Sequence, residues 1–90
     1  MDGQAGAGPE PGDDVARLRA RLEALVAADP LAALELSARV EALARAAAAD
    51  AAVAACGRGA SWSDVGNAFG ISKQAAHQRF AKHVRTAGQR

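Results

Sequence analysis

Near the C-terminus, residues 62–80 read WSDVGNAFGISKQAAHQRF, the pattern of two short helices joined by a tight turn. Ser61, just before this stretch, is a good N-cap, and with Asp64 it forms the Ser-x-x-Asp version of a capping box. Gly70 suits a turn in which the backbone takes a positive φ, and Ser72 can cap the next helix. We therefore predict one helix over about 62–69 and another that runs to about Val84, after which the chain frays.

The positions that face inward in such a helix pair hold apolar or small residues. Val65, Phe69 and Ile71 supply the apolar side chains, and Gly66 is the small residue where the two helices approach each other. All three aromatic residues of the chain lie in this region: Trp62, Phe69 and Phe80. The core of the C-terminal part is therefore predicted to form around these rings.

Two further helices are predicted upstream, on either side of Asp29-Pro30. The first has a cap at Asp13 or Asp14 and ends near Ala28. Its apolar residues recur at helical 3-4-3 spacing: Val15, Leu18, Leu22 and Leu25. The second begins at Pro30, since proline suits the first helical position, and ends near Cys56, before Gly57-Arg58-Gly59. Its apolar residues recur at 4-3-4 spacing: Leu36, Val40, Leu43 and Ala47.

These two apolar stripes predict an antiparallel helical hairpin. The second helix is longer than the first, so apolar surface remains for the C-terminal helices or for a second chain, and Leu31 and Leu34 offer a second face. A chain of 90 residues buries a limited core, and oligomerisation is the first candidate for further stabilisation. The alanine run over 46–55 is read equally as a surface for close helix approach and as a strong helix former.

Charge is distributed unevenly along the chain, although the net charge is only +1. Residues 57–90 carry six Lys or Arg against one acidic residue, whereas residues 1–56 carry five Arg against nine acidic residues. Basic charge on the C-terminal part is what phosphate contact requires, because neutralised phosphates release counterions. An ordinary solvated surface is the alternative reading.

At Ala60–His83 the chain resembles the helix-turn-helix regulators of bacteria, including the C-terminal DNA-binding region of sigma factors. The amino-acid sequence of this stretch is similar to that of small actinobacterial regulators. The resemblance implies a helix-turn-helix without a β-wing, whose second helix, at about 72–84, enters the DNA major groove. One departure concerns the middle of that helix, where many family members have a β-branched residue and a second apolar residue. This chain has Ala76 and Arg79 there, so Phe80 must fill the core.

By the family pattern, the base-facing residues are those exposed at the start and middle of the recognition helix: Ser72, Lys73, Gln74, His77 and Gln78. Glutamine amides can bind adenine, and a lysine can donate to guanine. Cations that fix the register on phosphates are expected at Arg58, Arg79, Lys82 and Arg85. Trp62 is expected to pack in the core rather than to stack on a base. For each of these residues, the alternative is an ordinary exposed helix position.

The predicted architecture is all-α: a tail over residues 1–12, expected to be disordered, a helical hairpin over 13–56 that is a candidate for coiled-coil dimerisation, a helix-turn-helix over 57–85, and a frayed tail over 86–90.

We expect no cofactor, metal or catalytic residue, and hence no enzyme. His77 and His83 are six residues apart and form a poor metal set with Cys56, which we expect to be a small buried hydrophobe that forms no internal disulfide. No apolar stretch reaches the roughly 20 residues of a membrane span, and the N-terminus does not resemble a secretory signal. Cytoplasmic, nucleoid-associated localisation is therefore expected.

These features favour a sequence-specific transcriptional regulator that binds double-stranded DNA as a homodimer through its N-terminal helices. Two recognition helices would then lie in successive major grooves. The alternative is a protein-interaction module that docks on a sigma factor, polymerase or another regulator, for which the acidic N-terminal half and low net charge argue. A third reading, an accessory protein in DNA packaging or recombination, shares the DNA contact.

Overall fold

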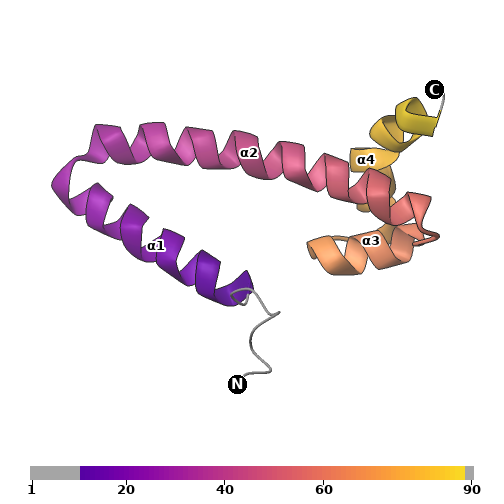
Figure 1. Cartoon of the computed structure of the whole chain (residues 1–90), viewed down its shortest axis with the longest axis horizontal. Helices are drawn as coiled ribbons and strands as arrows, with labels where there is room; N and C mark the ends of the chain where they lie inside the picture. The colour runs from indigo at the N-terminus through magenta and orange to yellow at the C-terminus, as the bar shows by residue number, and fades with distance from the viewer. Residues whose placement is uncertain (1–10, 89–90) are drawn as a thin grey trace, which may run out of the picture. The chain divides into compact units, whose positions relative to one another are not determined.

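The computed structural model describes residues 11–88, which form four helices and no strand: α1 (Pro11–Ala28), α2 (Pro30–Gly57), α3 (Trp62–Phe69) and α4 (Lys73–Gly88) (Figure 1). The prediction of an all-α fold is confirmed. Two helix ends differ from the prediction, because α1 begins at Pro11 rather than after Asp13 and α4 extends beyond Val84 to Gly88. Proline favours the first helical position, and the sequence after Val84 holds no helix-breaking residue before Gly88. The rest of the predicted N-terminal tail, residues 1–10, lies outside the described residues, as do residues 89 and 90 of the C-terminal tail.

The chain divides into two compact units within α2, between Glu41 and Ala42. From the sequence we placed the division at the end of this helix, near Gly57. The second unit starts earlier because Ala48, Ala52 and Cys56, from the second half of α2, belong to the same core as α3 and α4. Each unit is described by itself.

In the first unit, Asp29 connects α1 to α2. The Asp29 carboxylate accepts a hydrogen bond from the Ala32 N–H at 3.2 Å, and its carbonyl accepts one from the Ala33 N–H at 3.0 Å. Asp29 therefore caps α2, as residues of this type commonly do. Its own N–H donates to the Leu25 carbonyl at 2.7 Å and so closes the last turn of α1.

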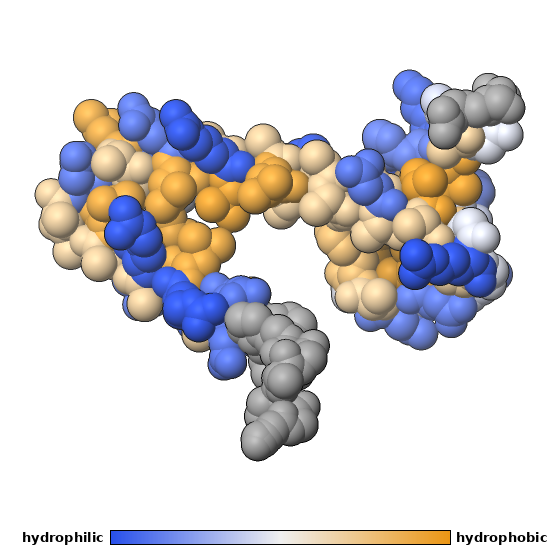
Figure 2. Space-filling view, viewed as in Figure 1, coloured by the Kyte–Doolittle hydropathy of each residue, from blue (hydrophilic) through white to orange (hydrophobic). Residues whose placement is uncertain are grey.

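Hydrophobic side chains of the first unit gather on the sides of α1 and α2 that face each other (Figure 2). Ala33 is buried, and the half-buried residues follow the predicted stripes: Leu18, Leu22, Leu25, Leu36 and Val40. Other apolar residues are exposed by more than half: Val15, Val26, Leu31 and Leu34. Val15 was predicted to belong to the stripe of α1, but it lies in the first turns of the helix and is 61% exposed. This unit therefore leaves four apolar side chains mostly exposed to their surroundings.

The core of the second unit contains Ala52, Val65, Ala76 and Phe80, and around it pack Ala48, Cys56, Trp62 and Ile71. Phe80 is 3% exposed and Ala76 is fully buried, so Phe80 fills the core beside a small residue, as predicted. Cys56 was predicted to be buried and is half-buried, with a free thiol.

Two apolar side chains of the second unit are more exposed than predicted. Leu43 is 72% exposed, so the apolar stripe of α2 does not continue through this position. Phe69 was predicted to face inward but is 43% exposed. Its ring meets the Phe80 ring edge to face, with centroids 5.5 Å apart. Phe69 stays partly open because α2 presents only alanines to this region, and these side chains are too short to cover the ring.

The junction between α3 and α4 is built as the sequence predicts. Ser61 Oγ accepts from the Asp64 N–H at 3.0 Å, and the Asp64 carboxylate accepts from the Ser61 N–H at 2.9 Å, which completes the capping box. Gly70 ends α3 in the left-handed region, with φ of 78°. Gly66 is buried where α3 meets the start of α4, and a Cβ atom there would lie 2.7 Å from the Ile71 carbonyl oxygen. Only glycine permits this approach without displacement of the backbone.

Candidate nucleic-acid interface

Helix α4 buries one side and exposes another. Ser72 caps it, since its Oγ accepts from the Ala75 N–H at 3.0 Å and its carbonyl accepts from the Ala76 N–H at 2.9 Å. Ala76 and Phe80 face the core. All five predicted base-facing residues are exposed: Ser72, Lys73, Gln74, His77 and Gln78. The start of α4 therefore presents hydroxyl, ammonium and amide groups to solvent.

His77 differs from the other four because its ring also contacts a side chain of α3. The imidazole and the Trp62 indole meet edge to face, with centroids 5.2 Å apart and an interplanar angle of 82°. Trp62 is half-buried and packs against the core, in agreement with the prediction for this residue. The contact restricts His77 to the side of α4 next to α3, whereas Gln74 and Gln78 lie one helical turn apart and share a face.

The four cations expected to contact phosphate are all exposed but do not form one row: Arg58, Arg79, Lys82 and Arg85. Arg58 lies in the turn after α2, where its N–H donates to the Ala54 and Ala55 carbonyls. Arg85 lies in the last turns of α4, where a cation interacts favourably with the helix dipole. The Arg79 guanidinium lies 4.9 Å from the Phe69 ring centroid and 5.6 Å from that of Phe80.

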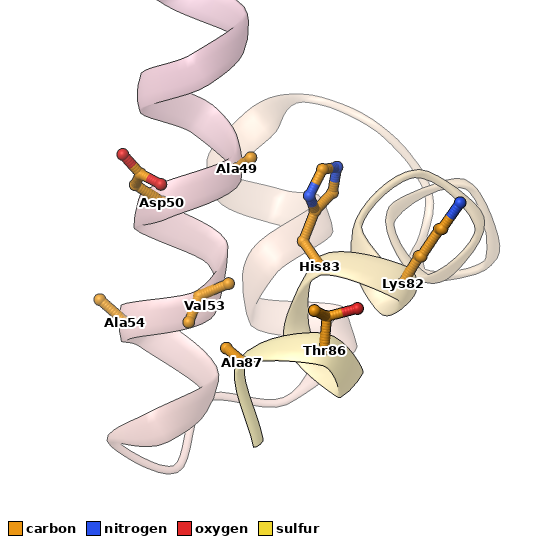
Figure 3. Close-up of a pocket in the computed structure, with 8 residues that line it drawn as sticks. All are labelled: Ala49, Asp50, Val53, Ala54, Lys82, His83, Thr86 and Ala87. Carbon is orange, nitrogen blue, oxygen red and sulfur yellow. The ribbon is translucent and has the colours of Figure 1, made fainter. Parts of the chain in front are cut away.

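An open recess of about 590 Å³ separates the second half of α2 from the C-terminal part of α4 (Figure 3). Its lining is mostly apolar: Ala49, Asp50, Val53, Ala54, Lys82, His83, Thr86 and Ala87. In Figure 3 the Asp50 carboxylate and the Lys82 ammonium point away from each other, and His83 lies beside Ala49. The charged groups are therefore at the edges of this recess, with alanine and valine between them.

A second, smaller recess of about 200 Å³ is lined by Arg45, Ala49, Arg79, Phe80 and His83. It brings Arg45 of α2 beside Arg79 and His83 of α4. Neither Arg45 nor His83 was among the predicted phosphate contacts. The pairing of α2 with α4 depends on tertiary packing, and no pattern in the sequence indicates which α4 residues Arg45 approaches.

The carboxylates of the described residues leave the cations of α4 unpaired. The one ion pair recorded over residues 11–88 joins Arg17 to Asp14 in α1, with an N–O distance of 2.6 Å. Asp64 is committed to the capping box, where hydrogen bonds from the Ser61 N–H and then the Ser61 hydroxyl lower the pKa of its carboxyl group. Positive charge on α4 is therefore available to a ligand.

Within residues 11–88, no group of three or more His, Cys, Asp or Glu side chains is placed to hold a metal ion. Over the same residues, no helix combines the length and the apolar character needed to cross a membrane. Comparison of the chain with models of known protein families, with curated proteins and with solved structures found no match.

Proposed function

We propose that the chain binds double-stranded DNA through α4, as a helix-turn-helix transcriptional regulator. The observation that carries this proposal is the exposure of all five polar residues at the start of α4. By helical spacing, Gln74 and Gln78 lie on the side away from the buried Ala76 and Phe80. A helix that is fixed to its support on one side and is polar on the other suits insertion into the major groove. The close approach at Gly66 and the left-handed turn at Gly70 give α3 and α4 a fixed relative orientation.

The residue types on this face suit base recognition. Gln74 and Gln78 carry amides that can donate to and accept from adenine, and Lys73 can donate to guanine. Ser72 Oγ already accepts a hydrogen bond from the backbone, but its own proton remains available to a base or a phosphate. His77 is the least free of the five because its ring packs on Trp62. We therefore assign sequence preference mainly to Lys73, Gln74 and Gln78.

The proposal includes a homodimer formed through the first unit. Val15, Leu31 and Leu34 are 61%, 73% and 66% exposed, and burying one such side chain contributes about 1.5–3 kcal/mol. Pairing would also let one dimer use two copies of α4 on the same DNA, which raises the affinity above that of a single weak contact; successive half-sites on one face of DNA lie about 34 Å apart. The expected setting is the nucleoid of a bacterial cell.

The test is selection of bound fragments from genomic DNA at several salt concentrations, followed by measurement of affinity for the selected site. We expect salt-dependent binding, and we expect Gln74→Ala to relax the preference at one base position at a cost of about 1–3 kcal/mol. Lys73→Ala should also weaken the selected site relative to other sequences. Arg21→Ala, an exposed charge removal in α1, is the matched control and should leave the preference unchanged. Binding that is absent at every salt concentration would refute the proposal.

A second candidate function is docking on another protein of the transcription machinery, such as a sigma factor or polymerase. The exposed apolar residues of the first unit favour it, because contiguous apolar surface commonly marks a protein interface. Light scattering separates the two candidates. A dimer mass supports self-pairing, whereas a monomer at all concentrations, together with a heteromeric complex from the host that survives nuclease and high salt, supports docking. DNA binding without sequence preference would indicate packaging or recombination.

A further inference from the structure

Three nitrogen-bearing side chains from two helices line one small recess in the second unit. Arg45 comes from α2, and Arg79 and His83 come from α4, where they are one turn apart. Ala49 and the buried Phe80 complete the lining. The volume of about 200 Å³ is several times the roughly 30 Å³ that a water molecule occupies in the liquid. The recess therefore has room for a small oxyanion.

Arg79 packs on two aromatic rings, of which that of Phe80 also lines the recess. Its guanidinium carbon lies 4.9 Å from the Phe69 centroid and 5.6 Å from the Phe80 centroid. Such contacts restrict a flexible side chain and leave its charge in place, since an aromatic ring carries no countercharge. Less side-chain entropy is then lost when Arg79 binds a ligand.

The positive charge of the recess has no acidic partner. No carboxylate is among its lining residues, and over residues 11–88 no ion pair is recorded for Arg45 or Arg79. Two guanidinium groups at one recess repel each other, and a bound anion removes this repulsion. Guanidinium groups donate in a fork that matches the oxygens of phosphates and carboxylates. Donors from two helices that line one recess suit the tetrahedral oxygens of a phosphate better than a planar carboxylate, which one guanidinium can satisfy alone.

We propose that Arg45, Arg79 and His83 form a binding site for a phosphate group. The two guanidinium groups and an imidazole N–H donate to its oxygens. The site goes beyond the proposed reading of bases by the start of α4 and does not depend on it, because free phosphate and a phosphate of the DNA backbone present the same chemistry.

The test is titration of the full chain with inorganic phosphate at constant ionic strength, followed by NMR of the arginine Nε–H groups and of the histidine rings. We expect the signals of Arg45, Arg79 and His83 to shift together along one saturating curve. Arg45→Gln should weaken phosphate binding by about tenfold or more, because a charge-assisted donor is lost. Arg39→Gln removes an exposed arginine from the same helix, outside the recess, and should leave the affinity unchanged. Equal small shifts at all arginines, or equal effects of the two variants, would overturn the proposal.

A second arm identifies the source of the phosphate. If a DNA backbone phosphate occupies the site, a duplex displaces inorganic phosphate, and Arg45→Gln weakens binding to every sequence and lowers the salt slope by about one. If the duplex leaves the three signals unmoved, free phosphate is the ligand. A chain that binds phosphate but no duplex would refute the proposed function and leave this site standing. A chain that reads DNA but gives no saturating phosphate shift would do the reverse.

Discussion

Replacement of Gly66 by alanine tests the arrangement on which the presentation of α4 depends. A Cβ atom at this position would lie 2.7 Å from the Ile71 carbonyl oxygen and 2.9 Å from the Ser72 carbonyl oxygen. Both contacts are with backbone, which cannot rotate away as a flexible side chain can. The start of α4 must therefore move away from α3 to admit one methyl group.

Two opposing effects set the magnitude. Alanine is favoured over glycine inside a helix by about 1 kcal/mol, whereas overpacking of a close contact costs typically about 1–3 kcal/mol. Distances below 3.0 Å to two oxygens place Gly66→Ala toward the upper part of that range, so we expect a net loss of about 1–2 kcal/mol. Gly57→Ala is the matched control in the same unit, since its Cβ would meet nothing within 4 Å and its φ is not positive. It should leave stability unchanged or raise it by up to about 1 kcal/mol.

The assay is thermal and urea unfolding followed by the fluorescence of Trp62. This residue is the only tryptophan of the chain and packs against the core of the second unit, so it reports on that unit alone. One kcal/mol shifts the Tm of a domain of this size by about 4–8 °C. Gly66→Ala should therefore lower the Tm by roughly 5–15 °C relative to the wild type. If both variants unfold at the same temperature, α3 and α4 do not approach as closely as described.

Three further substitutions follow from the second unit. Gly70→Ala meets no steric contact but forces a non-glycine residue to a φ of 78°, so the same fluorescence assay should show a loss of about 1–2 kcal/mol; an unchanged Tm would mean that the turn adopts another conformation. Phe80→Ala removes a ring that is 3% exposed and should lower the free energy of unfolding by about 3–5 kcal/mol, enough to abolish the cooperative unfolding transition of so small a unit. Retention of a sharp unfolding transition would contradict the role of Phe80 in the core. Asp64→Asn tests the capping box. The pKa of the Asp64 carboxyl is lower in the folded state than in the unfolded state. The stabilisation that the carboxylate provides is therefore present above about pH 4 and is lost as the pH falls through the folded-state pKa. Melts at pH 7 and pH 3 should show a smaller deficit of the variant at pH 3 than at pH 7, and the same deficit at both pH values would exclude this carboxylate as the cause.

The features that could be predicted from the sequence are those decided within a few residues. The capping box at Ser61 and Asp64, the cap at Ser72 and the turn at Gly70 each depend on hydrogen bonds or dihedral angles within one helical turn. Residue types at fixed offsets are enough to indicate them. The role of Gly66 followed because a tight turn brings the start of the next helix back onto the one before it.

The features that could not be predicted depend on which helix meets which. Helical spacing placed Leu43 and Phe69 on apolar stripes, but spacing does not show whether a partner covers the stripe, and both residues are exposed. The prediction of Arg79 as a phosphate contact stays a prediction, but the packing of its guanidinium over Phe69 and Phe80 and the recess it lines with Arg45 were not indicated by the sequence. The surroundings of Phe69 and Arg79 depend on how α2 packs against α3 and α4, which brings together residues far apart in the sequence.

One feature of α2 bears on two of these outcomes, the partly open Phe69 ring and the recess lined by Arg45 and Arg79. The alanine run was read equally as a surface for close approach and as a mere helix former, and its members divide by face: Ala52 is buried, Ala48 is half-buried, and Ala51 is exposed. Ala49, a member of this run, lines the recess with Arg45, Arg79 and His83, and its short side chain leaves that space open. The same short side chains cannot extend over Phe69, which stays partly open and offers its ring to Arg79. Substitution of larger apolar residues for these alanines would cover Phe69 only by separating α2 from α4, because protein cores are close-packed and admit added volume only by displacement. The partial exposure of the Phe69 ring and the recess lined by Arg45, Arg79 and His83 are therefore both consequences of the short alanine side chains of α2.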